Sequence, residues 1–166
     1  ERSGATAGLT RVRSFAQDDG HIFCTPEQVA DEVSGVADMY LETYAVFGLP
    51  VKIVLSTRPD KRAGDDALWD RAEAALKGAL DQRGDEYVID EGEGAFYGPK
   101  IDFFVKDALQ REHQLGTIQL DYVLPSPDRF NLRYIDADDK EQQPVMIHRA
   151  MLGSLERFMG LLIEHC

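Results

Sequence analysis

Residues 144–157, PVMIHRAMLGSLER, form an apolar run with two polar interruptions that a simple core segment does not need. The first is the adjacent pair His148-Arg149. The second is Arg157, which follows the small-residue turn Gly153-Ser154 on a stretch with helical apolar spacing. Packing alone does not place a charge on a core helix, so we hypothesise that Arg157 meets a ligand. The alternative is a structural arginine with a half-buried side chain.

The segment 92–100, GEGAFYGPK, contains three glycines, one proline and two aromatic residues. This composition disfavours a helix and an interior strand, and it therefore predicts a loop. Such a loop can bring its backbone close to a ligand, while Tyr97 offers a hydroxyl group and Lys100 a cation. A simple turn between two strands is the alternative interpretation.

The segment 8–24, GLTRVRSFAQDDGHIFC, alternates basic and apolar residues before a polar Gln-Asp-Asp-Gly stretch. The alternation predicts a strand over 8–14 with two different faces. The apolar residues that follow predict a second strand over 19–24. We therefore expect two strands that pair across a turn.

Two further segments carry helix signals. Residues 25–28, TPEQ, combine an N-cap threonine, a proline at the first helical position and a glutamine that can complete a capping box. Apolar spacing extends this helix to the Gly-Leu-Pro sequence at 48–50. Asp65 can cap a second helix over 66–82, which Gly84 ends.

The remaining apolar segments predict strands and a last helix. Because most strands follow one another without an intervening helix, we expect an α+β fold with an antiparallel sheet flanked by helices. The chain has no glycine-rich phosphate loop and no dinucleotide fingerprint. The remaining predicted strands cover about 51–55, 87–90, 101–106, 117–123 and 131–135, and the last helix covers about 149–164.

Length and charge narrow the class of protein. A chain of 166 residues with 43% hydrophobic and 29% charged residues suits one globular domain. Its net charge of −12 argues against a stand-alone RNA-binding module, because phosphate neutralisation drives such binding. No apolar stretch is long enough to cross a membrane, and we expect no membrane partner. The two cysteines, Cys24 and Cys166, form no disulfide framework and suit the cytoplasm.

The order of five motifs along the chain resembles bacterial threonyl-tRNA synthetase, a family of class II aminoacyl-tRNA synthetases. The resemblance covers residues 1–166, from within the second signature motif of the family to its third, as the C-terminal portion of the catalytic domain. It implies the antiparallel class II core. The motifs are RVRSFAQDDGHIF, LSTRPDKRAGDDALWDRAEAAL, GEGAFYGPKIDFF, LGTIQLDY and PVMIHRAMLGSLERF.

The resemblance implies a two-step reaction in which threonine and ATP, with Mg²⁺, form threonyl-adenylate, and threonine then passes to tRNA(Thr). Arg11 and Arg157 match the catalytic arginines that bind the nucleotide, since guanidinium groups can grip two oxygens at once. Simple packing on a strand and at a helix cap is the alternative role for Thr117 and Ser154. The positions that match further ATP contacts are Glu1, Phe15, Gln114, Thr117 and Ser154.

The resemblance also implies zinc, held by His21, His148 and an upstream cysteine, with a coordination position open to threonine. Spacing alone does not predict this site, because the two histidines lie far apart in the chain and a lone histidine is more often part of a core. Asp19 matches the residue that accepts a hydrogen bond from the threonine hydroxyl. We interpret Cys24 as core, because it lies on the opposite strand face from His21. The rest of the threonine pocket matches Gln17, Tyr97, Lys100 and Gln119.

Several parts of the family pattern are absent from this sequence. They are the upstream cysteine, the first arginine of the second motif, and the first motif, through which class II synthetases form homodimers. The editing domain and the anticodon-binding domain are absent as well. We therefore expect a homodimeric parent protein and little activity from this chain alone. The alternatives are a non-catalytic synthetase-like paralogue, a ligand-binding regulatory module, an interaction module without a ligand, and a synthetase for serine or proline.

Overall fold

The computed structural model describes residues 5–166, which form one main sheet, a small hairpin and three α-helices. The sheet strands are β1 (Gly20–Cys24), β2 (Val51–Ser56), β3 (Tyr87–Asp90), β4 (Lys100–Lys106), β5 (Glu112–Asp121) and β8 (Val145–Ala150). The hairpin pairs β6 (Tyr134–Ile135) with β7 (Glu141–Gln142). The helices are α1 (Val29–Val46), preceded by the 3₁₀ turn η1 (Pro26–Gln28), α2 (Asp66–Arg83) and α3 (Leu155–His165).

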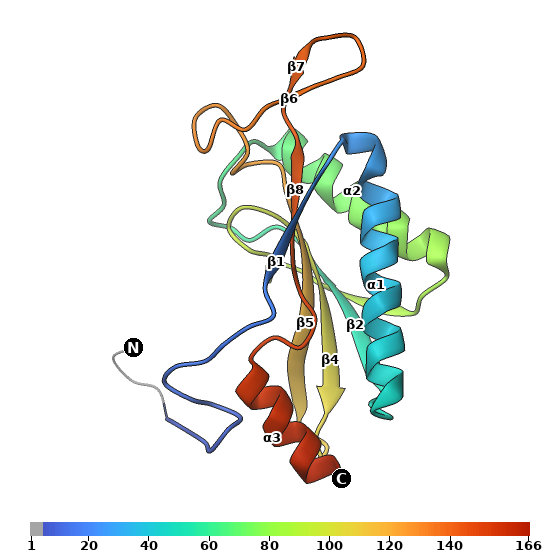
Figure 1. The fold of residues 1–166 in the computed structure, drawn as a ribbon, viewed down its shortest axis with the longest axis vertical. Helices are drawn as coiled ribbons and strands as arrows, with labels where there is room; N and C mark the ends of the chain where they lie inside the picture. The colour runs from blue at the N-terminus through green and yellow to red at the C-terminus, as the bar shows by residue number, and fades with distance from the viewer. Residues whose placement is uncertain (1–4) are drawn as a thin grey trace.

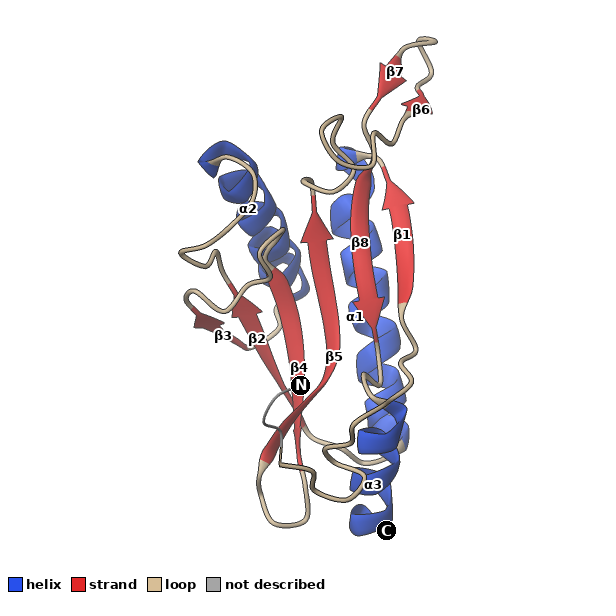
Figure 2. Ribbon diagram, turned by 90° about the vertical axis from the view of Figure 1, so that its left-hand side faces the viewer, coloured by secondary structure: helices blue, strands red, loops and turns tan. Residues whose placement is uncertain are grey.

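The six strands of the main sheet lie in the order β1-β8-β5-β4-β2-β3. Neighbouring strands are antiparallel, except that β2 and β3 are parallel. Helices α1 and α2 lie together on one face of this sheet, and α3 lies near one end of it (Figures 1 and 2). The mostly antiparallel sheet with flanking helices confirms the predicted fold class.

The hydrophobic core fills the space between the sheet and the α1–α2 layer. Ile101, Ile118 and Ile147, on three adjacent strands, are fully buried there. Tyr40 of α1 packs edge-on against Phe103 of β4, with ring centroids 5.2 Å apart. Because strand side chains alternate between the two faces, the residues between these apolar ones point to the other side of the sheet. The opposite face is therefore free to carry polar groups.

Local signals correctly predict where α1 and α2 begin and end. The side chain of Gln28 accepts a hydrogen bond from the Thr25 backbone N–H at 2.9 Å, which completes the predicted capping box before α1. Asp65 accepts a hydrogen bond from the Leu68 N–H at 2.9 Å and caps α2. Gly84 ends α2 in the left-handed conformation, at φ +74°.

Two predictions about the ends of the chain are wrong. Residues 8–14 form no strand, and β1 pairs with β8 instead. The segment before β1 packs against the start of α3, where the Leu155 N–H donates to the Ala16 carbonyl at 2.9 Å. The last helix begins at Leu155 and not near 149, because residues up to Ala150 continue β8. Long-range pairing overrides the local pattern at both places.

None of the helices in residues 5–166 is both long enough and apolar enough to span a lipid bilayer.

Candidate functional site

The open face of the sheet carries a row of polar side chains across four neighbouring strands. Lys100 of β4 stands opposite Gln119 of β5, which stands opposite His148 of β8. His148 in turn stands opposite His21 of β1. Residues paired in this way present their side chains to the same face. Sheet register therefore assembles four of the predicted threonine and metal residues into one line.

The two histidines of this row are in direct contact. The His21 and His148 rings meet edge-on, with centroids 4.8 Å apart. Two imidazoles that share a tetrahedral zinc ion, at Zn–N distances of about 2.0–2.1 Å, have ring centres roughly 5 Å apart. The pair therefore fits two positions of a zinc site. Within residues 5–166, no cluster of three or more His, Cys, Asp or Glu side chains could hold a metal ion.

A buried carboxylate fixes the orientation of one of these rings. Asp121, at the end of β5, is fully buried, and its Oδ2 lies 2.9 Å from Nε2 of His148. Its Oδ1 accepts hydrogen bonds from the backbone N–H groups of Val123 and Leu124 at 2.8 and 2.9 Å. With Oδ1 occupied, Oδ2 is left to accept a hydrogen bond from the Nε2–H of His148. Because Nε2 makes this contact, Nδ1 is the nitrogen of that ring that could bind a metal ion.

Tyr97 reaches the same row from the glycine-rich loop. Its hydroxyl donates to Oε1 of Gln119, and its ring centroid lies 5.0 Å from that of His148. Burial raises the pKa of the Tyr97 hydroxyl, and the charges of Asp121 and Asp19 raise it further. The hydroxyl therefore remains a neutral donor at physiological pH.

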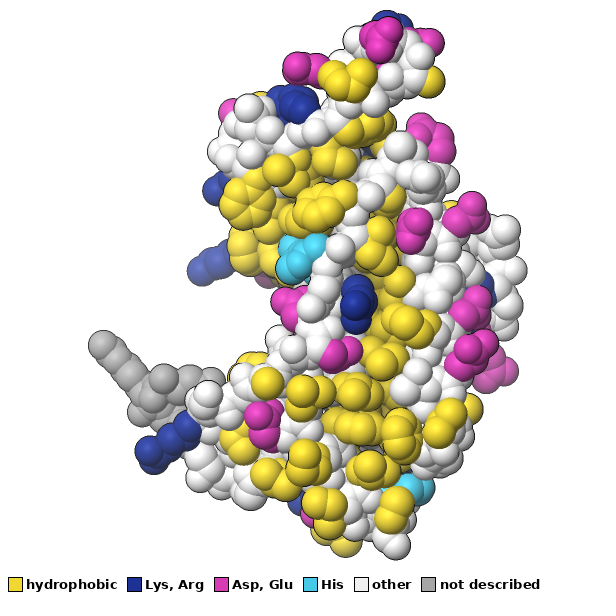
Figure 3. All heavy atoms as spheres, viewed as in Figure 1, with side chains coloured by type: hydrophobic (Ala, Val, Ile, Leu, Met, Phe, Trp, Pro, Cys, Tyr) yellow, Lys and Arg dark blue, Asp and Glu magenta, His cyan; other side chains and the backbone are white. Residues whose placement is uncertain are grey.

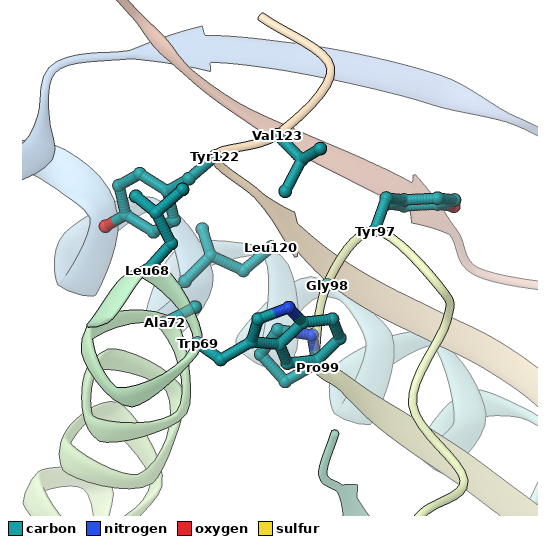
Figure 4. Close-up of a pocket in the computed structure, with 9 residues that line it drawn as sticks. All are labelled: Leu68, Trp69, Ala72, Tyr97, Gly98, Pro99, Leu120, Tyr122 and Val123. Atoms are coloured by element: carbon teal, nitrogen blue, oxygen red, sulfur yellow. The ribbon is translucent and has the colours of Figure 1, made fainter. Parts of the chain in front are cut away.

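Protein contacts hold part of the glycine-rich loop in place, as the alternative interpretation of a turn between strands expects. A Cβ at Gly98 would collide with the carbonyl oxygen of Leu120, so glycine is needed for close approach to β5. Figure 4 shows Trp69 of α2 against the Gly98-Pro99 turn, with the Tyr97 ring pointing away from it. The indole N–H donates to the carbonyl of Ala63 at 2.8 Å. This packing fixes where Tyr97 lies.

Next to the polar row lies an open pocket of about 360 Å³. It brings together the N-terminal segment, β5, β8 and the start of α3. The surface is indented on this side of the molecule, beside the N-terminal segment (Figure 3). Every predicted ATP-binding residue from 5 to 166 lines the pocket, and so does Gln17 from the predicted threonine pocket. These residues are Arg11, Phe15, Gln17, Gln114, Thr117, Ser154 and Arg157.

A β-bulge is the reason that two residues of β5 both reach this pocket. Gln114 and Thr117 are three positions apart, a spacing that puts them on opposite faces of a regular strand. The register between β4 and β5 shifts at Phe103/Phe104, so Gln114 pairs with Phe104 and Thr117 with Asp102. Because of this shift, the side chains of Gln114 and Thr117 lie on the same face of the sheet. The buried Thr117 hydroxyl has no hydrogen-bond partner within residues 5–166, so it can bond to a ligand.

The start of α3 forms one wall of the pocket. Ser154 is the N-cap and accepts a hydrogen bond from the Arg157 N–H at 3.2 Å, so its expected capping role and its place in the pocket coexist. The Arg157 side chain donates from Nε to the Thr10 carbonyl at 3.0 Å and from Nη1 to the Gln114 carbonyl at 3.3 Å. Two backbone carbonyls thus hold this guanidinium group at the pocket.

Glu156 and Asp18 are structural residues that join the pocket walls. Glu156 accepts the Ala16 N–H at 3.1 Å and so fastens the segment that carries Phe15 to α3. A protein partner therefore explains this charge without a ligand. Asp18 accepts the backbone N–H groups of Met151 and Leu152 at 2.8 and 3.0 Å.

The remaining predicted residues have more exposed or undescribed positions. Phe15 is 55% exposed, and Arg11 is also exposed at the pocket. Asp19 lies exposed two residues before His21. Glu1, predicted to contact the nucleotide, lies outside the described residues. Cys24 is buried in the core, and burial together with the charge of Glu32 raises the pKa of its thiol to about 11.

Sequence reasoning missed the buried carboxylates that support the site. Asp102 and Asp121 each interrupt an apolar strand at a position of the polar face. A charged residue inside a predicted strand was the available signal for both. Their partners are non-local, and only the strand register identifies them.

The whole chain, residues 1–166, matches the model of the family described as tRNA synthetase class II core domain (G, H, P, S and T). It is 55% identical to the threonine–tRNA ligase of Thermotoga maritima over 165 residues, which are 99% of this chain and 26% of that protein. The threonine–tRNA ligase of Campylobacter lari is also 55% identical, over 100% of this chain and 27% of that protein. The chain thus spans about a quarter of the length of these curated relatives.

A solved structure supports the same relationship. It is described as the RNA binding domain of threonyl-tRNA synthetase from Cryptosporidium parvum Iowa II, and it superposes with a TM-score of 0.91 at 50% identity. The match covers 96% of this chain and 40% of that chain. With a family model that spans every residue and a fold shared with a solved synthetase, the chain belongs to the class II tRNA synthetase core-domain family.

Proposed function

We propose that this chain is the ATP- and threonine-binding part of a threonyl-tRNA synthetase catalytic domain. The observation that carries the proposal is the convergence of two predicted residue sets on one sheet face. The pocket beside α3 gathers the nucleotide set, and the row from Lys100 to His21 gathers the threonine and metal set. These residues come from distant parts of the chain, and a common ligand site gives one reason for their meeting.

In the nucleotide pocket, Phe15 and the guanidinium group of Arg157 line a space in which both can stack on an adenine ring. Arg11 adds a second permanent cation for the phosphates, which ATP brings together with Mg²⁺. The unpartnered Thr117 hydroxyl and the Gln114 side chain provide hydrogen bonds. The chain's own residues thereby hold ATP and balance its charge without acting as nucleophile or base.

On the polar row, His21 and His148 would hold a zinc ion together with a ligand from outside the described residues. When bound, the ion supplies a Lewis acid to the amino and hydroxyl groups of threonine. Asp121 keeps the His148 ring in place, and Tyr97 and Gln119 hold each other through their hydrogen bond. Asp19, two residues from His21, is available to accept a hydrogen bond from the hydroxyl group of threonine. This polar set selects against valine, which lacks the hydroxyl group.

The complete reaction needs more chain than the 166 residues. We infer that the parent protein transfers threonine to tRNA(Thr), forms a homodimer and works in the cytoplasm. Because this segment has a net charge of −12, which disfavours contact with phosphates, we infer that other domains make most of the RNA contacts.

The test is threonine-dependent ATP–pyrophosphate exchange by the full-length protein that contains this segment. We expect exchange with threonine and none with valine. His21→Ala and His148→Ala should each lower zinc content measured by mass spectrometry, and each should reduce exchange by at least about 100-fold, as loss of a metal ligand requires. Circular dichroism should show an intact fold.

His165→Ala is the matched control, because this exposed histidine lies at the end of α3. It should keep both zinc and activity. Full zinc content in both site variants would refute the metal assignment. Exchange that depends on serine or proline but not on threonine would refute the assignment of threonine as the substrate. An absence of exchange with any amino acid would favour a non-catalytic, ligand-binding role.

A further inference from the structure

Asp102 is a buried carboxylate between the nucleotide pocket and the threonine row. It lies on β4, is 2% exposed, and faces the same side of the sheet as Lys100. Its Oδ2 accepts a hydrogen bond from Ser56 Oγ at 2.9 Å and lies 2.8 Å from Lys100 Nζ. Its Oδ1 accepts a hydrogen bond from Gln114 Nε2 at 2.7 Å. A buried charge is costly without such partners, so all three contacts stabilise it.

The contact with Gln114 determines which atom this side chain offers to the pocket. An ionised carboxylate can only accept hydrogen bonds, so the glutamine must turn its NH₂ group toward Asp102. Its carbonyl Oε1 is then the end left for a ligand. The backbone carbonyl of the same Gln114 also accepts a hydrogen bond from Arg157 Nη1. The position of Gln114 therefore affects two groups of the nucleotide pocket.

The contact with Lys100 acts on the other half of the site. Lys100 stands opposite Gln119 in the polar row, and its side chain is 17% exposed. The ion pair with Asp102 holds its ammonium group at the sheet face. Lysine has a flexible side chain, so without this anchor the ammonium group can occupy many other positions.

We propose that Asp102 is a positioning residue that orients Gln114 at the nucleotide pocket and Lys100 at the threonine row, and so links ATP binding to threonine binding. The inference rests on the proposed function. Asp102 itself touches neither substrate. This role requires the negative charge of Asp102, because a neutral amide of the same size cannot accept hydrogen bonds from both Gln114 and Lys100.

The test replaces that charge in the full-length protein. In Asp102→Asn, the single amide oxygen cannot accept from both Lys100 and the NH₂ of Gln114. Either Lys100 loses its acceptor, or Gln114 turns its carbonyl toward the new NH₂ and presents its own NH₂ to the pocket. The negative charge is lost from both contacts, so the KM for ATP and the KM for threonine should each rise by roughly tenfold. Both constants are measured by pyrophosphate exchange. Ser56→Ala removes a partner of Asp102 that lies in neither set, and it should change each KM by less than about twofold.

Adding Gln114→Glu to Asp102→Asn provides a second readout. The amide can then donate to the new carboxylate, so the melting temperature should recover toward that of the parent protein. The KM for ATP should stay raised, because the pocket now holds a negative charge where it had a neutral amide. A recovered KM for ATP would show that only packing matters, and would overturn the proposal.

If Asp102→Asn does not fold, Lys100→Met supplies the same test from the threonine side. It should raise the KM for ATP as well as the KM for threonine, whereas Lys106→Met, at the exposed end of β4, should raise neither. A change confined to the threonine KM would overturn the proposed link. So would an Asp102→Asn protein with a lower melting temperature and unchanged KM values. A parent protein without threonine-dependent exchange refutes the proposed function itself, and the inference with it.

Discussion

Replacing Arg157 tests the nucleotide pocket most directly. Its guanidinium group has five N–H donors, and two of them bond to the carbonyls of Thr10 and Gln114 at 3.0 and 3.3 Å. The remaining donors and the flat face are available to ATP. A lost hydrogen bond to a charged group costs about 1.5–3 kcal/mol. At 1.4 kcal/mol per tenfold change, Arg157→Ala should slow threonine-dependent pyrophosphate exchange by about 10- to 150-fold.

The exchange assay isolates adenylate formation from transfer to tRNA, so the loss should appear without any RNA present. Arg157→Lys retains the charge but not the fork geometry, and its rate should fall between those of the parent protein and the alanine variant. Met159→Ala is the control on the same helix, since Met159 is 53% exposed, and it should stay within about twofold of the parent. An unchanged rate in a folded Arg157→Ala protein would make this residue a structural arginine, and would refute the nucleotide assignment of the pocket.

Two further predictions concern the scaffold of the 166-residue chain. Burial raises the pKa of the Cys24 thiol to about 11, so at pH 8 roughly one molecule in a thousand carries the reactive thiolate at Cys24. A thiol reagent should therefore modify the exposed Cys166 quickly and Cys24 only after unfolding. Rapid labelling of both cysteines would refute the burial argument. Asp65→Ala should lower the free energy of unfolding, measured by urea titration, by about 1 kcal/mol, because the N-cap of α2 is lost. Asp65→Ser should keep most of the stability of the parent chain, because serine also caps helices. Equal stability of the two variants would contradict the capping role.

The sequence alone predicted those features that local chemistry controls. The capping box at Thr25, the N-cap at Asp65 and the glycine stop at Gly84 each act through neighbours within a few residues, so helix boundaries could be predicted from them. Apolar patterns predicted β1, β2, β3, β4 and part of β5, and with them the α+β class, but they did not predict β8. The family resemblance then supplied the candidate site residues, whose roles remain predictions.

The sequence could not predict which strands become neighbours. The alternating residues 8–14 fit a strand locally and were expected to pair with β1. In the structure β1 pairs instead with β8, which lies more than one hundred residues further along the chain. Likewise, residues 149 and 150 suit a helix or a strand, and the pairing of β8 with β5 decides for the strand. Strand pairing depends on contacts between distant segments, which no local window contains.

The sequence by itself thus determined the helix caps, several of the strands and the kinds of side chain available for a site. Only the tertiary structure decided how those side chains meet. Sheet register aligned Lys100, Gln119, His148 and His21 in one row, and a single bulge turned Gln114 to the face of Thr117. The same register buried Asp102 and Asp121 beside their partners. The physical reason is the two-residue period of a strand, since a shift of one position moves every side chain to the opposite face.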